Sequence, residues 1–126
     1  MNFRRHIPAI VWGLAILVIT GLPGNYVPRI HDFWELLSTD KLIHLGMFAP
    51  FSFLLVRGFG ATKKYLRKSL LKSGLIGTVY AIFTELMQFY LIPGRNGNIY
   101  DAIADIVGVS IGLYAFYRFR KIKNFI

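Results

Sequence analysis

The chain has 126 residues, of which 55% are hydrophobic, 16% aromatic and only 17% charged, and it carries a net charge of +9. A soluble domain has about a quarter of its residues charged and must cover a small core with polar surface, so this composition excludes an ordinary soluble domain. The absence of cysteine excludes a disulfide framework, a thiolate zinc site and a catalytic thiol. The length allows one domain, which we expect to cover residues 1–126.

Four apolar segments follow one another along the chain, each close to the roughly 20 residues that span a bilayer core. We expect helices over residues 7–22, 40–56, 70–92 and 101–119. Arg4 and Arg5 precede the first segment as in a signal peptide, but no small-x-small cleavage pattern ends it, so we expect a retained helix. The predicted fold is therefore an all-α integral membrane four-helix bundle.

The three links between these segments differ in composition. The first, residues 23–39, contains an amphipathic stretch at 31–37 that we expect to lie in the membrane interface, with Trp34 at headgroup depth. The second, residues 57–69, is basic. The third, residues 93–100, is rich in glycine and asparagine and predicts a tight turn.

The basic residues predict the orientation of the bundle. With both termini in the cytoplasm, 12 of the 15 lysines and arginines lie on the cytoplasmic side, and only Arg29, Lys41 and Arg95 fall outside it. The positive-inside rule favours this orientation, in the bacterial cytoplasmic (inner) membrane. Because the basic runs lie next to helix ends, we interpret them as topology determinants and expect no nucleic-acid partner.

The acidic residues are distributed in the opposite way. All six fall in the predicted outer half of the bundle, at Asp32, Glu35, Asp40, Glu85, Asp101 and Asp105. Acidic residues contribute little to membrane topology, so this distribution requires a separate cause.

Helical spacing predicts that several of these polar residues point into the bundle. Asp40 and His44 are four residues apart, Glu85 and Gln88 three, and Asp101 and Asp105 four, so each pair shares one helix face. The face of the last pair continues through small residues, Gly108 and Gly112, and that of Glu85 through Ala81, Thr78 and Gly74. Since small residues mark close helix contacts in membranes, we expect Glu85 and Asp105 to face other helices and not lipid.

The charge of this cluster does not balance. Asp40, Glu85, Asp101 and Asp105 face only Lys41 and Arg95, with His44 of uncertain charge. Burial of unpaired carboxylates requires a proton, water, a cation or a cationic ligand group. The alternative interpretation is structural: Asp40 and Asp101 favour helix dipoles, Lys41 snorkels to headgroups, Arg95 is an exposed surface charge in the turn, and His44, Glu85 and Asp105 form a hydrogen-bond network.

Four motifs in order carry a resemblance to a known family. They are Asp40-Lys41-x-x-His44, Glu85-x-x-Gln88, Pro93-Gly94-Arg95-x-Gly97 and Asp101-x-x-x-Asp105-x-x-Gly108. Over roughly residues 38–115 the chain resembles the VanZ-like family of small bacterial membrane proteins, in which position 105 is often asparagine. The resemblance implies a role in the cell envelope, since the founding type is linked to resistance against the lipid-tailed glycopeptide teicoplanin.

Two functions agree with these residues. The first is binding of a membrane lipid or a lipid-linked cell-wall component by Asp40, Lys41, His44, Glu85, Gln88, Arg95, Asp101 and Asp105. The second is a membrane-embedded enzyme for a lipid-linked phosphate, with His44, Glu85 and Asp105 as catalytic residues and a divalent metal left open as a cofactor. An ion pathway is disfavoured because no polar relay crosses the midplane of the predicted bundle. Four short helices are few to enclose a deep cavity, so a homodimer is the alternative to a monomer.

Overall fold

The computed structural model describes residues 3–26, 39–60, 62, 64–95 and 97–123. Its helices are α1 (Ile7–Thr20), α2 (Thr39–Gly58), α3 (Leu66–Leu91) and α4 (Ile99–Lys123), with short 3-10 turns η1 (Phe3–Arg5) and η2 (Gly24–Tyr26). The described residues contain no strand, as predicted. The predicted interfacial segment at 31–37, with Trp34, lies outside the described residues.

The predicted helices are all present, with shifted ends. α3 begins at Leu66 instead of residue 70, and α4 continues to Lys123 instead of ending at residue 119. The added turn of α3 contains Arg67 and Lys68, and the added turn of α4 contains the basic C-terminal run. Arginine and lysine form helices well, although they lower the hydropathy on which the predicted ends were based. α1 ends at Thr20, because Gly21 and the following Pro23 close it.

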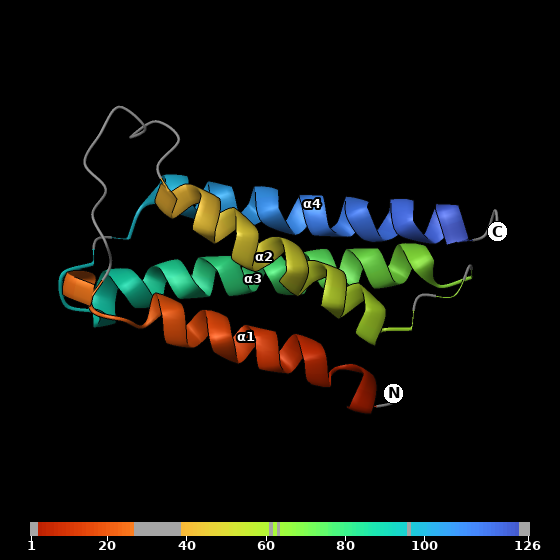
Figure 1. Cartoon of the computed structure of the whole chain (residues 1–126), viewed down its shortest axis with the longest axis horizontal. Helices are drawn as coiled ribbons and strands as arrows, with labels where there is room; N and C mark the ends of the chain where they lie inside the picture. Colours follow the sequence, from red (N-terminus) through yellow and green to blue (C-terminus); the bar gives the residue numbers. More distant parts are fainter. Residues whose placement is uncertain (1–2, 27–38, 61, 63, 96, 124–126) are drawn as a thin grey trace.

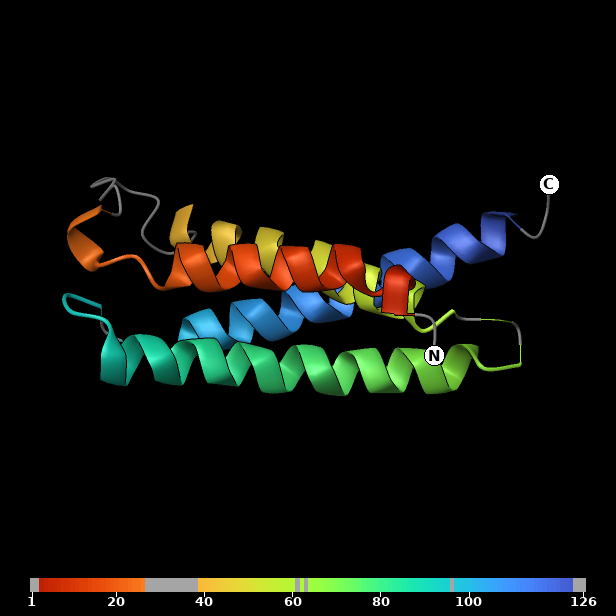
Figure 2. The ribbon, with the colours of Figure 1, turned by 90° about the horizontal axis from the view of Figure 1, so that it is seen from below.

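The helices run alternately up and down, so that the start of α1 and the end of α4 lie at the same end of the bundle (Figure 1). α2 and α4 form the most extensive helix pair, α3 lies mainly against α4 and also against α2, and α1 lies mainly against α2. A view from below separates α1 and α2 from the long α3 (Figure 2). The ends of α1 and α3 therefore meet the starts of α2 and α4 at one end of the molecule.

Glycines bring α2 and α4 close together. A Cβ atom at Gly108 would lie 2.7 Å from the carbonyl oxygen of Leu45, and one at Gly112 would collide with the carbonyl of Ala49 and the hydroxyl of Ser52. That hydroxyl donates a hydrogen bond across the interface to the Val109 carbonyl at 2.9 Å. The predicted close contact through Gly108 and Gly112 is thus confirmed.

The side chains of α3 are arranged as in a membrane helix. Its buried positions are small or polar, at Ser69, Ser73, Gly77, Ala81, Thr84, Glu85 and Gln88. Apart from the basic residues Arg67, Lys68 and Lys72 near its start, its exposed positions are mostly large and apolar, including Leu71, Leu75, Ile76, Val79, Ile82, Phe83, Leu86 and Phe89. A surface helix of a soluble protein has the opposite pattern, whereas small and polar contacts between apolar exteriors are typical of helices in lipid.

This buried face differs slightly from the predicted one. Ala81 is fully buried as expected, but Gly74 and Thr78 are only half-buried and flank the contact face. Ser73 and Gly77 take the central positions, because α4 approaches there: a Cβ at Gly77 would meet the Val109 side chain at 2.9 Å.

Two of the described helical segments, Leu66–Leu91 and Ile99–Lys121, are long and apolar enough to cross a bilayer. α1 is apolar but has only 14 residues. Hydrogen bonds to backbone carbonyls attach it to the other helices: Trp12 Nε1 donates to Met47 at 2.8 Å, and the Tyr80 hydroxyl donates to Gly13 at 2.7 Å.

Candidate functional site

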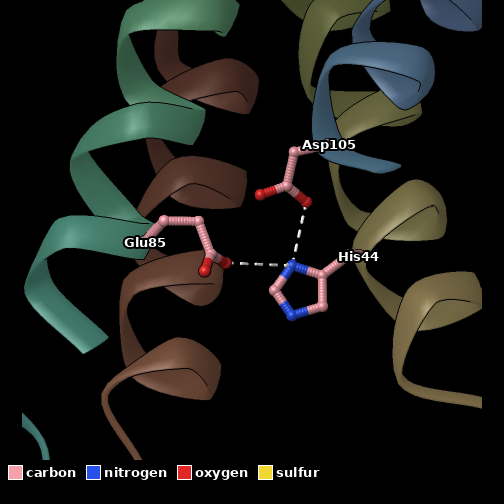
Figure 3. A group of neighbouring side chains, drawn as sticks. All are labelled: His44, Glu85 and Asp105. Carbon is pink, nitrogen blue, oxygen red and sulfur yellow. Dashed lines mark hydrogen bonds and ion pairs between the residues drawn. The ribbon is translucent and has the colours of Figure 1, made fainter. Parts of the chain in front are cut away.

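Three ionisable side chains from three different helices meet inside the bundle (Figure 3). The Nδ1 atom of His44 on α2 lies 2.9 Å from Oδ1 of Asp105 on α4, and 3.7 Å from Oε1 of Glu85 on α3. We call His44, Glu85 and Asp105 the triad. The short distance is a hydrogen bond, and because an ionised carboxylate can only accept, we assign the N–H at Nδ1 of His44 as its donor.

The helix directions explain why these residues meet. His44 lies in the second turn of α2 and Asp105 in the second turn of α4, and both helices begin at the same end of the bundle. α3 runs the opposite way, so Glu85, two turns before its end, reaches the same level. The predicted convergence of these three residues near one end is observed.

The triad is shielded from the surroundings. His44 is 2% exposed, Glu85 7% and Asp105 0%. Ionised groups in such an environment require close partners, because burial removes the water that otherwise solvates them. In Figure 3 the carboxylates approach the same imidazole nitrogen, and the second ring nitrogen lies on the side away from both.

Asn98 holds Glu85 in place, and sequence reasoning missed it. Its backbone N–H donates to Oε2 of Glu85 at 3.1 Å, while its side-chain oxygen accepts a hydrogen bond from the Tyr100 N–H at 3.0 Å. Asn98 thus caps α4 and orients a triad carboxylate. An asparagine directly before a helix is a recognisable capping signal, but its backbone contact with Glu85 depends on the path of the turn. Oε1 of Glu85 has no hydrogen-bond partner among the described residues.

A groove leads from the apolar exterior to Glu85. It has a volume of about 290 Å³ and lies between the end of α3 and the start of α4. Apart from Glu85 and Asn98 its lining is apolar or glycine, with Ile82, Leu86, Phe89, Gly97, Ile99 and Ala102. Glu85 therefore belongs both to the buried triad and to the wall of an apolar groove.

The triad also has the chemical composition of a metal site. One ligand atom from each member can be chosen so that all lie within 4.8 Å of one another. Imidazole nitrogen and carboxylate oxygen are common ligands of divalent cations in proteins.

Comparison with known families agrees with the motifs found in the sequence. The family model described as VanZ/LLP1 matches residues 9–120, which include every helix-borne motif residue and the turn between α3 and α4. The chain belongs to the VanZ/LLP1 family. This confirms the resemblance predicted from the ordered motifs. Searches among curated proteins and among solved structures find no significant match.

In this VanZ/LLP1 protein two motif residues outside the triad make contacts with the backbone of another segment. Besides the triad, Gln88 and Arg95 bind backbone carbonyls at and just after the end of α1: Gln88 Nε2 donates to the Thr20 carbonyl at 3.1 Å, and Arg95 Nε donates to the Leu22 carbonyl at 3.3 Å. These predicted ligand residues join the end of α1 to the end of α3 and its turn. Gly94 has a φ of +73°, a value that glycine adopts without strain.

The remaining predicted site residues lie at the same end. Asp101 is 7% exposed and lies one turn before Asp105 on α4. Lys41 is half-buried in the first turn of α2. Asp40 belongs to that same turn, but its side chain is outside the described part of the structure. In contrast, the described basic side chains at the end of α2, the start of α3 and the end of α4 lie at the opposite end, including Arg57, Arg67, Lys68, Lys72, Arg118, Arg120 and Lys121.

Membership of the family supports, at the family level, a membrane protein of the cell envelope related to glycopeptide resistance. The apolar α3 and α4 of this VanZ/LLP1 protein agree with a membrane location.

Proposed function

We propose that this protein is a four-span protein of the bacterial inner membrane that binds the headgroup of a lipid or lipid-linked cell-wall component at its extracytoplasmic end. The observation that carries the proposal is the double position of Glu85, in the triad and in the wall of the apolar groove. A hydrocarbon chain in the groove would contact Leu86 and Phe89 while its polar end reaches Glu85. Ligand sites commonly combine such an apolar wall with a few convergent polar groups.

The charge distribution along the bundle supports the orientation. Basic side chains gather at the end that holds the start of α1 and the end of α4, and buried acidic side chains gather at the other. The positive-inside rule assigns the basic end, and with it both termini, to the cytoplasm. The triad then lies near the extracytoplasmic surface, where envelope precursors and lipid-tailed glycopeptides are found.

The orientation has a direct test, because the chain contains no cysteine. We expect a single cysteine at exposed Asn25, beside the triad end, to react with a membrane-impermeant maleimide in intact cells. A cysteine at exposed Thr62, in the link between α2 and α3, is expected to react only after permeabilisation. The reverse pattern would contradict the proposed orientation.

Arg95 is the basic residue expected to meet a phosphate. It lies in the turn next to the groove, and its Nε donates a hydrogen bond to the Leu22 carbonyl. The other N–H groups of the guanidinium are further donors for a phosphate oxygen. Lys41, in the first turn of α2, is the second candidate at this end.

We expect purified protein in nanodiscs to bind a fluorescent polyprenyl phosphate, with affinity reduced at least about tenfold by Arg95→Ala, since hydrogen bonds to charged groups contribute about 1.5–3 kcal/mol. Arg57→Ala, at the opposite end, is the matched control. Ala102→Phe should also weaken binding by filling the groove, whereas Ala115→Phe, at an exposed position further along α4, should not. Equal binding by wild type, Arg95→Ala and Ala102→Phe would refute lipid recognition at this site.

A hydrolytic role for the same site is a second candidate, and the His44–Asp105 hydrogen bond favours it. The His44 imidazole, held by the Asp105 carboxylate at 2.9 Å, would accept the proton of a water molecule that attacks a lipid-linked phosphate. The phosphorus–oxygen bond to the lipid then breaks, and the proton passes to the departing lipid alcohol. Phosphate release from the polyprenyl phosphate, lost in His44→Ala, would establish this activity; binding without release would exclude it for that substrate.

A further inference from the structure

We propose that His44, Glu85 and Asp105 bind a divalent transition-metal cation, Zn²⁺ or Mn²⁺, between α2, α3 and α4. The second part of the inference rests on the proposed function: the cation gives this carboxylate-rich site the positive charge that a lipid phosphate requires. Carboxylates alone would repel the phosphate, so the cation explains how the two can share one site.

The distances within the triad are close to those of a coordination sphere. With metal–ligand distances of about 2.1 Å, ligand atoms are separated by about 3.0 Å in octahedral and about 3.4 Å in tetrahedral geometry. The separations from His44 Nδ1 are 2.9 Å to Asp105 and 3.7 Å to Glu85. The ligand oxygens of Glu85 and Asp105 lie within 4.8 Å of each other, so a cation in contact with all three residues would draw these two side chains together by up to about 1.4 Å.

Glu85 points independently to a missing positive group. It is 7% exposed, and its Oε1 has no hydrogen-bond partner among the described residues. The Nδ1 atom of His44 lies 3.7 Å from Oε1, beyond hydrogen-bond distance. Oε1 is thus a buried carboxylate oxygen that faces an imidazole and a second carboxylate without a hydrogen-bonded positive group among the described residues. A bound cation would supply that group.

Neighbouring groups already orient the triad side chains toward one another, as metal binding would require. The Asn98 N–H fixes the other oxygen of Glu85 at 3.1 Å, and so leaves Oε1 directed at His44. The ligands project from three packed helices and not from flexible loops. Such outer contacts orient ligands and strengthen metal binding. Binding displaces the proton from Nδ1, because a histidine ligand must be deprotonated at the coordinating nitrogen.

The ligand types select among metals. Imidazole suits Zn²⁺ and other transition metals, and carboxylate suits Mn²⁺ as well, whereas Mg²⁺ and Ca²⁺ prefer oxygen ligands throughout. Three protein ligands leave at least one position open, as in sites where a metal meets a substrate oxygen. The open position is where a phosphate oxygen of the lipid would bind.

The experiment uses the full-length protein in nanodiscs, stripped with a chelator and dialysed against Zn²⁺ or Mn²⁺ alone. We expect about one metal ion per chain by elemental analysis and a metal-dependent rise in Tm. His44→Ala and Glu85→Gln should lower the bound metal at least tenfold, and His6→Ala, at the opposite end of the bundle, should retain it. If His44→Ala does not fold, Glu85→Gln decides the question, because it keeps the volume of the side chain.

Each result has a clear meaning. Metal content that is equal in wild type and Glu85→Gln, or binding of Mg²⁺ or Ca²⁺ in preference to Zn²⁺ and Mn²⁺, would overturn the metal site. Polyprenyl phosphate binding that needs the metal, at least tenfold weaker after chelation, would support its role in phosphate recognition. Unchanged lipid binding after chelation would overturn that role alone, while metal binding without any lipid binding would instead refute the proposed function.

Discussion

Replacing Gly112 by alanine is expected to lower the free energy of unfolding by about 3 kcal/mol, the upper end of the usual cost of overpacking. The added methyl group would collide with the carbonyl oxygen of Ala49 and the hydroxyl of Ser52 on α2. A backbone carbonyl inside a helix cannot rotate away, so α2 and α4 must separate along their main contact. Equilibrium unfolding in mixed detergent–SDS micelles measures the change.

The same substitution at Gly46 is the matched control. Gly46 also lies within a helix, α2, and is partly exposed, and among the described residues no atom outside its own stretch of helix backbone lies within 4 Å of a Cβ built there. We expect Gly46→Ala to be neutral or to stabilise the protein by about 0.5 kcal/mol, because alanine loses less backbone entropy than glycine on folding. Similar effects at the two positions would contradict the close α2–α4 contact.

The buried pair of His44 and Asp105 is expected to show strong energetic coupling. Asp105→Ala removes the acceptor at 2.9 Å from Nδ1 and should destabilise the protein by about 3 kcal/mol, the upper end of what a hydrogen bond to a charged group contributes. His44→Ala should have a comparable effect. The double substitution should cost about 2 kcal/mol less than the sum, because each single substitution already removes the hydrogen bond that joins the two residues.

Asp105→Asn tests whether the pair needs a charge or only an acceptor. Its amide oxygen can still accept from Nδ1, so the fold should be retained with a loss of under about 1.5 kcal/mol, the net value of a typical hydrogen bond. A double-mutant cycle of His6 with Asp105 is the control, since His6 lies at the start of α1, at the opposite end from the triad. His6→Ala and Asp105→Ala should be additive within about 0.5 kcal/mol, and additivity of the His44 pair as well would exclude the coupling.

The helices and their number could be predicted because their signal is local. Each apolar run is long enough to satisfy its own backbone hydrogen bonds as a helix, and the links contain glycine, proline or charge. The ends were less accurate, as at Leu66 and Lys123, because hydropathy does not register arginine and lysine as helix formers. The contact face of α3 was displaced by one position, from Gly74 and Thr78 to Ser73 and Gly77, since the direction from which α4 approaches is not encoded in α3 itself.

The candidate site was predictable in part. Helical spacing together with chain direction brings His44, Glu85 and Asp105 to one level, and the structure places them within a few ångströms of each other. The spacing could not show that Gln88 and Arg95 bind carbonyl groups at the end of α1, because those contacts join residues 68 and 73 positions apart. Nor could it show that the Asn98 N–H supports Glu85, which depends on how the turn folds back.

The sequence by itself determined a membrane-type chain of four apolar helices, with basic residues toward one end and acidic residues toward the other. These properties depend on composition and on the repeat of a single helix, which neighbouring residues decide. Only the tertiary structure decided that His44 shares one nitrogen between two carboxylates, and that Glu85 also borders an apolar groove. Distances of this kind depend on the rotation and crossing of whole helices, and the close approach of α4 to α2 at Gly108 and Gly112 is one contact that fixes them.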